Sequence, residues 1–148
     1  MNDFELVKIK KEDCDLVYRW ANDLEVRKNS FSSEIISYDE HVEWFNKKML
    51  SEDTEMYLFK NNTIPVGMLR LEKQSENLKL INYSIDKHYR KVGLGTELLK
   101  QTKNLFSDIT LIGKVKKANI SSTKAFENSD YKLVKEFDDY FVYSNKYE

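Results

Sequence analysis

The spacing of apolar residues changes along the chain, and the first change falls within its first 23 residues. Residues 4–9 alternate between apolar and polar side chains, which predicts a strand. Within residues 12–23, Leu16, Val17 and Trp20 fall on one helical face. We therefore expect the chain to begin with a strand and an amphipathic helix.

A second helix is predicted over residues 37–50, after a short polar stretch read as a connection. Ser37 and Glu40 have the spacing of a capping box, in which each side chain binds the other residue's backbone N–H. Three apolar residues recur along this segment at helical spacing: Val42, Phe45 and Met49.

Three strand-like runs follow, at residues 55–61, 63–73 and 77–86. Short turns at Asn61–Asn62 and at residues 74–76 join them. The remaining predicted elements are a helix that opens at residues 93–95 and carries Leu94, Leu98 and Leu105, a strand at 109–116, a short helix at 119–128, and strands at 131–137 and 139–145. The order β-α-α-β-β-β-α-β-α-β-β predicts one mixed α/β domain over residues 1–148.

Composition narrows the classes of partner. The 24 Lys and Arg are balanced by 25 Asp and Glu and are scattered, so neither nucleic acid nor an acidic membrane is expected as a partner. The single Cys14 is expected to be a small buried hydrophobe. No apolar run approaches the ~18 residues that span a bilayer, and Met1–Asn2–Asp3 does not begin a signal peptide. A cytoplasmic protein without a metal is the expectation.

Two of the four glycines, Gly93 and Gly95, lie close behind Arg90 and Lys91 at the start of a predicted helix. Such a turn exposes the first backbone N–H groups of the helix, where the helix dipole favours an anion. Glycine is needed there if a side chain would block a phosphate or if φ is positive. A tight turn that only needs small residues is the structural alternative.

Three kinds of phosphate loop compete for this stretch. The Rossmann fingerprint requires a third glycine where Leu98 stands, and a P-loop requires Gly-Lys-Ser/Thr, which is absent. Residues 90–95 match the third kind, R-x-x-G-x-G. This is the pyrophosphate-binding loop of the GCN5-related N-acetyltransferases (GNAT), and the chain resembles that superfamily over essentially its full length.

The resemblance implies a GNAT fold, of class α/β (α+β), with a mixed, mostly antiparallel sheet of about seven strands flanked by about four helices. It also implies acetyl-CoA as the acetyl donor. The segment from Asn119 resembles the part of the family in which an asparagine starts a short helix, although a plain helix cap is the alternative for Asn119. The cofactor-binding residues that the resemblance implies are Ser84, Ile85, Arg90, Lys91, Val92, Gly93, Leu94, Gly95, Thr96, Asn119, Ser122 and Phe126.

Two positions depart from the family's pattern. Many members have a general-base glutamate where this chain has Leu80, and a general-acid tyrosine where it has Phe126. Orienting an amine against a thioester still supplies much of the rate, and the family's backbone donor near Ser84 and Ile85 would stabilise the oxyanion. Tyr83 is the candidate to donate or receive a proton, with core packing as its alternative. The missing glutamate favours an acceptor amine less basic than lysine.

The segment from Arg19 to Met49 is similar to the N-acetyltransferases of nucleotide-sugar pathways, particularly the 4-amino-sugar enzymes of pseudaminic-acid biosynthesis. The shared features are Trp20–Ala21–Asn22–Asp23, Val26–Arg27, Ser30–Phe31, His41 with Trp44–Phe45, and the G-x-x-R of Gly67–Met68–Leu69–Arg70. The acceptor-binding residues that this similarity implies are Arg27, Ser30, Phe31, His41, Trp44 and Arg70.

Each of these roles has a structural alternative. The planar fork of Arg27 suits a diphosphate, but it also suits a surface acid. Trp44 can stack on a uracil or sugar ring or belong to the core. His41 is a candidate base, although a lone histidine is more often structural, and Arg70 can simply pair with Glu72 on the same strand face.

The predicted function is acetyl transfer from acetyl-CoA to a primary amine, the 4-amino group of a UDP-linked amino-deoxy sugar. One alternative acceptor is a protein N-terminus or another small amine. Another alternative is a non-catalytic CoA-binding module, which Leu80 and Phe126 favour. Tyr140, Phe141 and Tyr143 indicate an apolar surface at which a homodimer can form.

Overall fold

The computed structural model describes residues 2–146 of the chain. Seven strands form one sheet in the order β1-β2-β3-β4-β5-β7-β6. The strands are β1 (Phe4–Lys8), β2 (Thr54–Asn61), β3 (Ile64–Ser75), β4 (Leu78–Ile85), β5 (Thr110–Lys116), β6 (Lys132–Glu136) and β7 (Tyr140–Ser144). The β4–β5 pair is parallel and the other neighbouring pairs are antiparallel, which confirms the predicted mixed, mostly antiparallel sheet.

The helices are α1 (Cys14–Ala21), α2 (Leu24–Asn29), α3 (Tyr38–Leu50), α4 (Leu94–Leu105) and α5 (Ile120–Asn128), with 3-10 turns at Lys11–Asp13 and Lys87–Tyr89. Within residues 2–146, none of them is long and apolar enough to cross a membrane. The predicted order of elements is confirmed, except that the polar stretch after α1 contains the additional helix α2. Asp23 caps this helix by accepting hydrogen bonds from the backbone N–H groups of Glu25 and Val26, at 3.1 and 3.2 Å.

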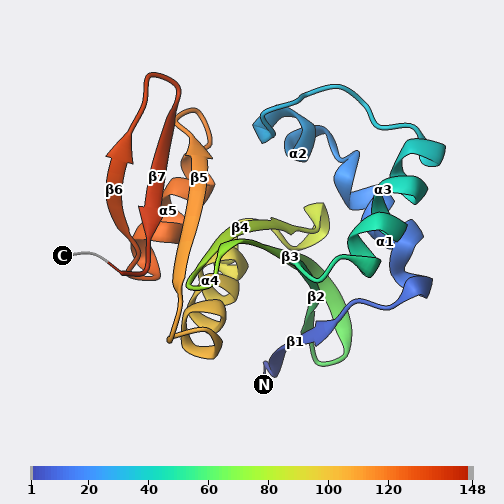
Figure 1. Cartoon of the computed structure of the whole chain (residues 1–148), viewed down its shortest axis with the longest axis horizontal. Coiled ribbons are helices and arrows are strands. Elements are labelled where there is room, and N and C mark those ends of the chain that lie inside the picture. The colour runs from blue at the N-terminus through green and yellow to red at the C-terminus, as the bar shows by residue number, and fades with distance from the viewer. Residues whose placement is uncertain (1, 147–148) are drawn as a thin grey trace.

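A hydrophobic cluster lies on each face of the sheet. Alternation along β2 illustrates this, because Met56 and Leu58 pack with α1 and α3, whereas Phe59 belongs to the cluster that contains Leu98 and Leu99 of α4. Figure 1 shows α1, α2 and α3 grouped on one side of the molecule and α4 and α5 on the other. Helices α1 and α3 therefore cover one face of the sheet, and α4 covers the other.

Tyr143 corrects one prediction about the surface. Its side chain is 1% exposed and its ring stacks on Phe126 at 5.5 Å, so it belongs to the core and not to an apolar surface. Its neighbours Tyr140 and Phe141 are half-buried.

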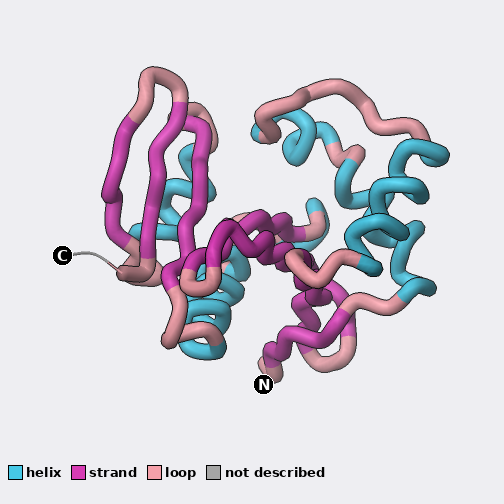
Figure 2. The backbone as a smooth tube through the Cα atoms, in the orientation of Figure 1, coloured by secondary structure: helices cyan, strands magenta, loops and turns pink. Residues whose placement is uncertain are grey.

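The sheet splits between its two parallel strands. Pairing of β4 with β5 runs from Leu78 opposite Thr110 to Ile81 opposite Gly113. Both strands continue beyond these residues, to Ile85 and Lys116, without further pairing to each other. Figure 2 shows β5, β7 and β6 diverging from the other strands in this region. The divergence leaves backbone from the end of β4 available to a ligand.

Candidate active site

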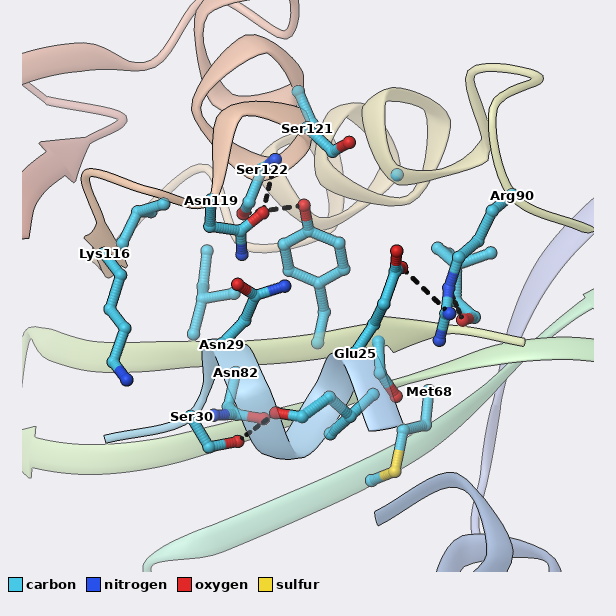
Figure 3. Close-up of a pocket in the computed structure, with 18 of the residues that line it drawn as sticks. Glu25, Asn29, Ser30, Met68, Asn82, Arg90, Lys116, Asn119, Ser121 and Ser122 are labelled. Atoms are coloured by element: carbon cyan, nitrogen blue, oxygen red, sulfur yellow. Dashed lines mark hydrogen bonds and ion pairs between the residues drawn. The ribbon is translucent and has the colours of Figure 1, made fainter. Parts of the chain in front are cut away.

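The divergence of β4 and β5 opens into a cavity of about 680 Å³. Its walls come from α2 and the turn after it, from β3, β4 and β5, from the first residues of α4 and from α5 (Figure 3). Val17 and Ala21 of α1 and Trp44 of α3 also line it. Of the residues predicted to contact the cofactor, all but Val92 line this cavity, and of those predicted to contact the acceptor, all but His41 do. Val92 is 70% exposed instead.

The glycine loop supplies an anion-binding end to the cavity. Gly93 is the N-cap residue of α4 and has φ +82°, a left-handed conformation that L side chains rarely adopt. It offers no side chain to cap the helix, and the N–H groups of Leu94, Gly95 and Thr96 have no acceptor among the described residues. An ideal Cβ on Gly95 would lie 3.4 Å from the Tyr83 ring, which is ordinary contact. The loop therefore presents open donors at a positive helix end.

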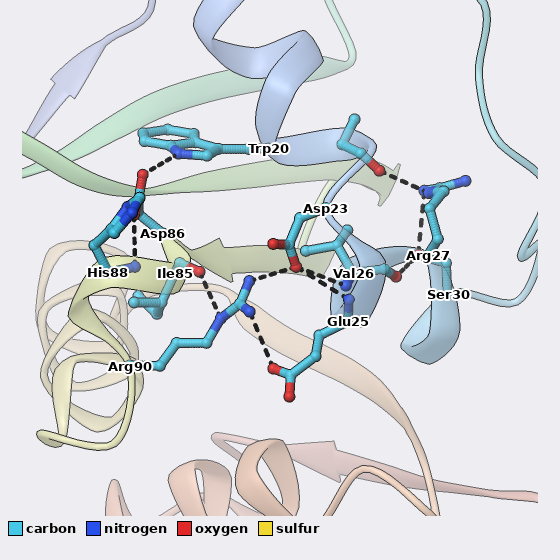
Figure 4. Close-up of polar contacts among 11 residues, drawn as sticks. Trp20, Asp23, Glu25, Val26, Arg27, Ser30, Ile85, Asp86, His88 and Arg90 are labelled. Carbon is cyan, nitrogen blue, oxygen red and sulfur yellow. Dashed lines mark hydrogen bonds and ion pairs between the residues drawn. The ribbon is translucent and has the colours of Figure 1, made fainter.

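Arg90 has partners other than the pyrophosphate predicted for it. Its Nε donates to the carbonyl of Ile85 at 3.0 Å, while its terminal nitrogens pair with Asp23 at 2.7 Å and Glu25 at 3.0 Å (Figure 4). Burial alone would raise the pKa of Asp23, but hydrogen bonds from Arg90 and the α2 backbone lower it below its usual value. Arg90 thus fastens the glycine loop to the start of α2.

The other end of α2 contacts the opposite half of the sheet. Lys116 of β5 donates to the carbonyl of Lys28 at 3.3 Å. Just beyond α2, Phe31 packs edge-to-face on Tyr140 of β7, with ring centroids 5.4 Å apart. Together with the Arg90 contacts, these place α2 across the divergence of the sheet as one wall of the cavity.

Tyr83 and Ser122 form a hydroxyl pair inside the cavity, 2.9 Å apart. Burial raises the pKa of Tyr83 to about 12, so the phenol is protonated at neutral pH and can donate a hydrogen bond. Ser122 sits in the first turn of α5, where its backbone N–H is capped by the Asn119 side chain at 3.2 Å. Asn119 therefore has the capping role, and its amide still faces the cavity.

Phe126 belongs to the core of the protein at the base of the cavity. It is 2% exposed, and its ring meets Tyr131 edge-to-face at 5.1 Å. Gly113 of β5 is required beneath it, since an added Cβ would lie 2.2 Å from the Phe126 ring. A phenylalanine at this position has no group that can move a proton.

Arg27 is turned toward the protein rather than toward a diphosphate. Its Nε donates to the Ala21 carbonyl at 2.6 Å, and its terminal nitrogens donate to the carbonyls of Ser32 at 3.1 Å and Glu34 at 3.2 Å. A further bond at 3.2 Å reaches the hydroxyl of Ser30. Four of the five guanidinium donors are therefore used to hold the segment after α2.

Arg70 lies on the wall of the cavity that β3 forms. Its guanidinium carbon is 5.1 Å from the centroid of the Trp44 ring, and its Nε pairs with Glu72 at 3.1 Å. Glu72 also pairs with Lys48 of α3. The predicted Arg70–Glu72 contact is thus present, while Arg70 and Trp44 both line the cavity.

His41 lies outside the cavity. It is 1% exposed on α3, and its Nε2 donates to the carbonyl of Cys14 in α1 at 3.0 Å. Burial lowers its pKa, against the opposing effects of that hydrogen bond and of Asp15. A neutral imidazole that joins two helices in this way has a structural role.

Sequence reasoning missed several lining residues, among them Glu25, Asn29, Asn82, Lys114 and Lys116. Asn82 was recognisable as sharing a strand face with Ser84, which was a usable signal. For Lys114 and Lys116 no such signal existed, because their place depends on the divergence of β5 from β4.

The family model described as "Acetyltransferase (GNAT) domain" matches residues 3–132 of the chain. The chain belongs to this family. It is therefore a GNAT N-acetyltransferase, and acetyl-CoA is its acetyl donor. The residues at the glycine loop fit that donor, because free backbone N–H groups at a helix start suit a pyrophosphate.

Solved structures of acetyltransferases share the fold at low sequence identity. The aminoglycoside acetyltransferase AAC(6')-Ib in complex with ribostamycin and coenzyme A has a TM-score of 0.81 and 15% identity, over 96% of this chain and 92% of that one. The spermidine N-acetyltransferase from Vibrio cholerae, in complex with CoA and spermine, gives 0.80 and 15%, over 95% and 92%. RimL, a ribosomal L7/L12 alpha-N-protein acetyltransferase, gives 0.80 and 14%, over 95% and 92%. Among curated protein sequences, none matches this chain significantly.

Proposed function

We propose that this GNAT enzyme acetylates the amine of an anionic acceptor, the 4-amino group of a UDP-linked amino-deoxy sugar. The charge of the cavity is the observation that carries this proposal. Seven cationic side chains and one carboxylate, Glu25, line it; the cations are Arg27, Arg70, Arg90, Lys91, Lys114, Lys116 and Lys124. Arg90 is paired with Glu25, and Arg70 is paired with Glu72, which lies behind the lining. The other five cations have no carboxylate partner among the described residues.

The phosphates of acetyl-CoA would neutralise only some of these cationic side chains. Lys91 lies in the glycine loop and Lys124 lies on α5, at the end of the cavity expected to hold coenzyme A. Arg70, Lys114 and Lys116 come from the strands on either side of the divergence. A polycation such as spermine or an aminoglycoside would meet like charges there, whereas a diphosphate would meet opposite ones.

The chain's own residues have two chemical roles in the proposed reaction. Acetyl-CoA supplies a thioester, and the acceptor's nitrogen forms the new C–N bond as the C–S bond breaks. Unpaired backbone at the end of β4 is available to stabilise the oxyanion, and the Tyr83–Ser122 pair is available to protonate the departing thiolate. The amine proton passes to solvent, which suits an amine of lower basicity than lysine.

Release of free CoA thiol tests this function. The protein would be incubated with acetyl-CoA and, separately, a UDP-4-amino-4,6-dideoxy sugar, spermine, an aminoglycoside and a peptide with a free N-terminus. We expect release with the nucleotide sugar at the highest kcat/KM. Faster release with spermine or the peptide would reject the sugar assignment, and tight acetyl-CoA binding without release from any amine would indicate a binding module.

Two further predictions from the sequence stay predictions. Self-association into a homodimer is one, with Tyr140 and Phe141 as its remaining apolar residues, and molecular mass in solution measures it. Cytoplasmic location is the other.

A further inference from the structure

Arg70 is held in place by the protein on two sides. The carboxylate of Glu72 binds its Nε at 3.1 Å, and the Trp44 ring lies against its guanidinium at 5.1 Å. Glu72 is itself held by an ion pair with Lys48 of α3. Only 22% of the Arg70 side chain is exposed, so its position is determined by packing as well as charge.

The terminal nitrogens of Arg70 are not used in this arrangement. Neither has a hydrogen-bond acceptor within the described residues, although the residue lines the cavity. This contrasts with Arg27, whose fork is almost fully occupied by carbonyls and a hydroxyl. An arginine that is braced at Nε and open at its terminal nitrogens offers two donors to one anionic group.

The strand register gives the distance along the sheet between Arg70 and the end of β4, where the amine is taken to react. Arg70 is directly opposite Asn82, and Met68 is directly opposite Ser84, so the four side chains share one sheet face. The Arg70–Asn82 pair lies two residues along the strands from the Met68–Ser84 pair, or about 7 Å. Asn82 adds an amide donor beside Arg70 (Figure 3 shows Asn82 and Met68 in the cavity).

We propose that Arg70 and Asn82 form a subsite for an anionic oxygen group that the acceptor carries about 7 Å from its reactive amine. This inference rests on the proposed function, and it takes the amine to react at the end of β4, beside Ser84. A pyranose holds its C4 amine and its C1 oxygen at opposite ends of the ring, so the anomeric phosphate of a 4-amino sugar has the required span. An α-amino acid does not, because its carboxylate is two bonds from the amine.

The measured quantity is the ratio of kcat/KM for two acceptors, the UDP-linked 4-amino-4,6-dideoxy sugar and the methyl glycoside of the same amino sugar. We expect the wild-type ratio to favour the UDP sugar. Arg70→Met should reduce the ratio by on the order of 10- to 100-fold, the factor for losing a charge-assisted contact. Arg70→Lys should reduce it less, because lysine keeps the charge and loses the fork.

A second variant does not depend on the stability of the Arg70 variants. Asn82 is exposed, and Asn82→Asp places a negative charge in the subsite, which should reduce the same ratio by a similar factor. Arg19→Met is the matched control, because Arg19 is exposed on α1 and does not line the cavity. A glycoside bearing a carboxylate in place of the phosphate distinguishes a general anion subsite from a phosphate subsite.

The outcomes separate the two proposals. An unchanged ratio in both Arg70→Met and Asn82→Asp, with the UDP sugar still acetylated, would overturn the subsite and leave the proposed function standing. A wild-type enzyme that acetylates the methyl glycoside as well as the UDP sugar would also overturn the subsite. Failure of the wild type to acetylate either sugar, with release of thiol from another amine, would overturn the proposed function, and the subsite with it.

Discussion

Gly93 and Gly95 are one residue apart, yet only Gly93 is required by the backbone conformation. Gly93 has open space around its Cβ position and a φ of +82°, so its requirement is conformational. Gly95 has no such φ, and an added Cβ would meet Tyr83 at 3.4 Å and the Ala125 Cβ at 3.6 Å, both ordinary contacts. Gly93→Ala should therefore lower the free energy of unfolding by about 1–2 kcal/mol without any ligand present. Gly95→Ala, the matched control, should change it by much less. Thermal unfolding of the two apo variants measures this, and equal losses would contradict it.

Helix α2 is the element that connects the donor and acceptor sides of the cavity. Arg90 binds its first turn through Asp23 and Glu25, and Lys116 binds its last turn at the Lys28 carbonyl. Because the pKa of Asp23 is lowered, the pair persists at neutral pH and is lost only as the pH falls below the usual value of 3.8 and through the lowered pKa. The pairing is therefore intact at the pH at which the enzyme would be assayed.

Asp23→Asn tests the role of this ion pair, because asparagine keeps the helix cap and removes the charge. We expect kcat/KM for the acceptor to fall by about 3- to 10-fold, since the ion pair with Glu25 alone would hold α2 less firmly against the glycine loop. Glu12→Gln is the control, as Glu12 is an exposed acid that does not line the cavity. Steady-state kinetics measures the change. A loss in Asp23→Asn no greater than in Glu12→Gln would reject the positioning role.

At the scale of the whole molecule, the divergence of β4 and β5 makes the cavity and leaves the two parts of the sheet joined over only a few residues. A ligand that fills the divergence should stabilise both parts together. At 100 times Kd, acetyl-CoA should add about 2.7 kcal/mol to the free energy of unfolding. That corresponds to a rise in Tm of roughly 5–10 °C for a domain of this size.

Amide hydrogen exchange locates the effect. Acetyl-CoA should slow exchange at Leu94–Thr96 and also at residues 82–85 of β4. ADP carries the diphosphate without the pantetheine arm, so it should protect Leu94–Thr96 alone. Equal protection of β4 by ADP would mean that the arm does not occupy the divergence.

Much of the fold was predictable because its signals are local. The strands between residues 54 and 85 follow from alternation and short turns, and α3 follows from its Ser37 cap, which accepts from the Glu40 N–H at 3.2 Å. Helix α2 was missed because its start depends on Asp23 as a cap rather than on apolar spacing. Tyr143 was misassigned to the surface because nothing in a short terminal strand indicates which face the core will cover.

The sequence by itself determined the donor side of this protein. R-x-x-G-x-G combines a glycine in a left-handed conformation, a helix start and nearby charge within six residues, so its chemistry can be recognised without knowing the contacts of the rest of the chain.

Only the tertiary structure decided how the acceptor side is arranged. Arg27, Arg70 and His41 are all candidate acceptor-binding residues in the sequence, and the structure separates them by their partners. Carbonyls occupy Arg27, α1 buries His41, and Glu72 with Trp44 leaves Arg70 open to the cavity. Those partners come from separate elements brought together by folding, because a side chain's availability depends on what packs against it.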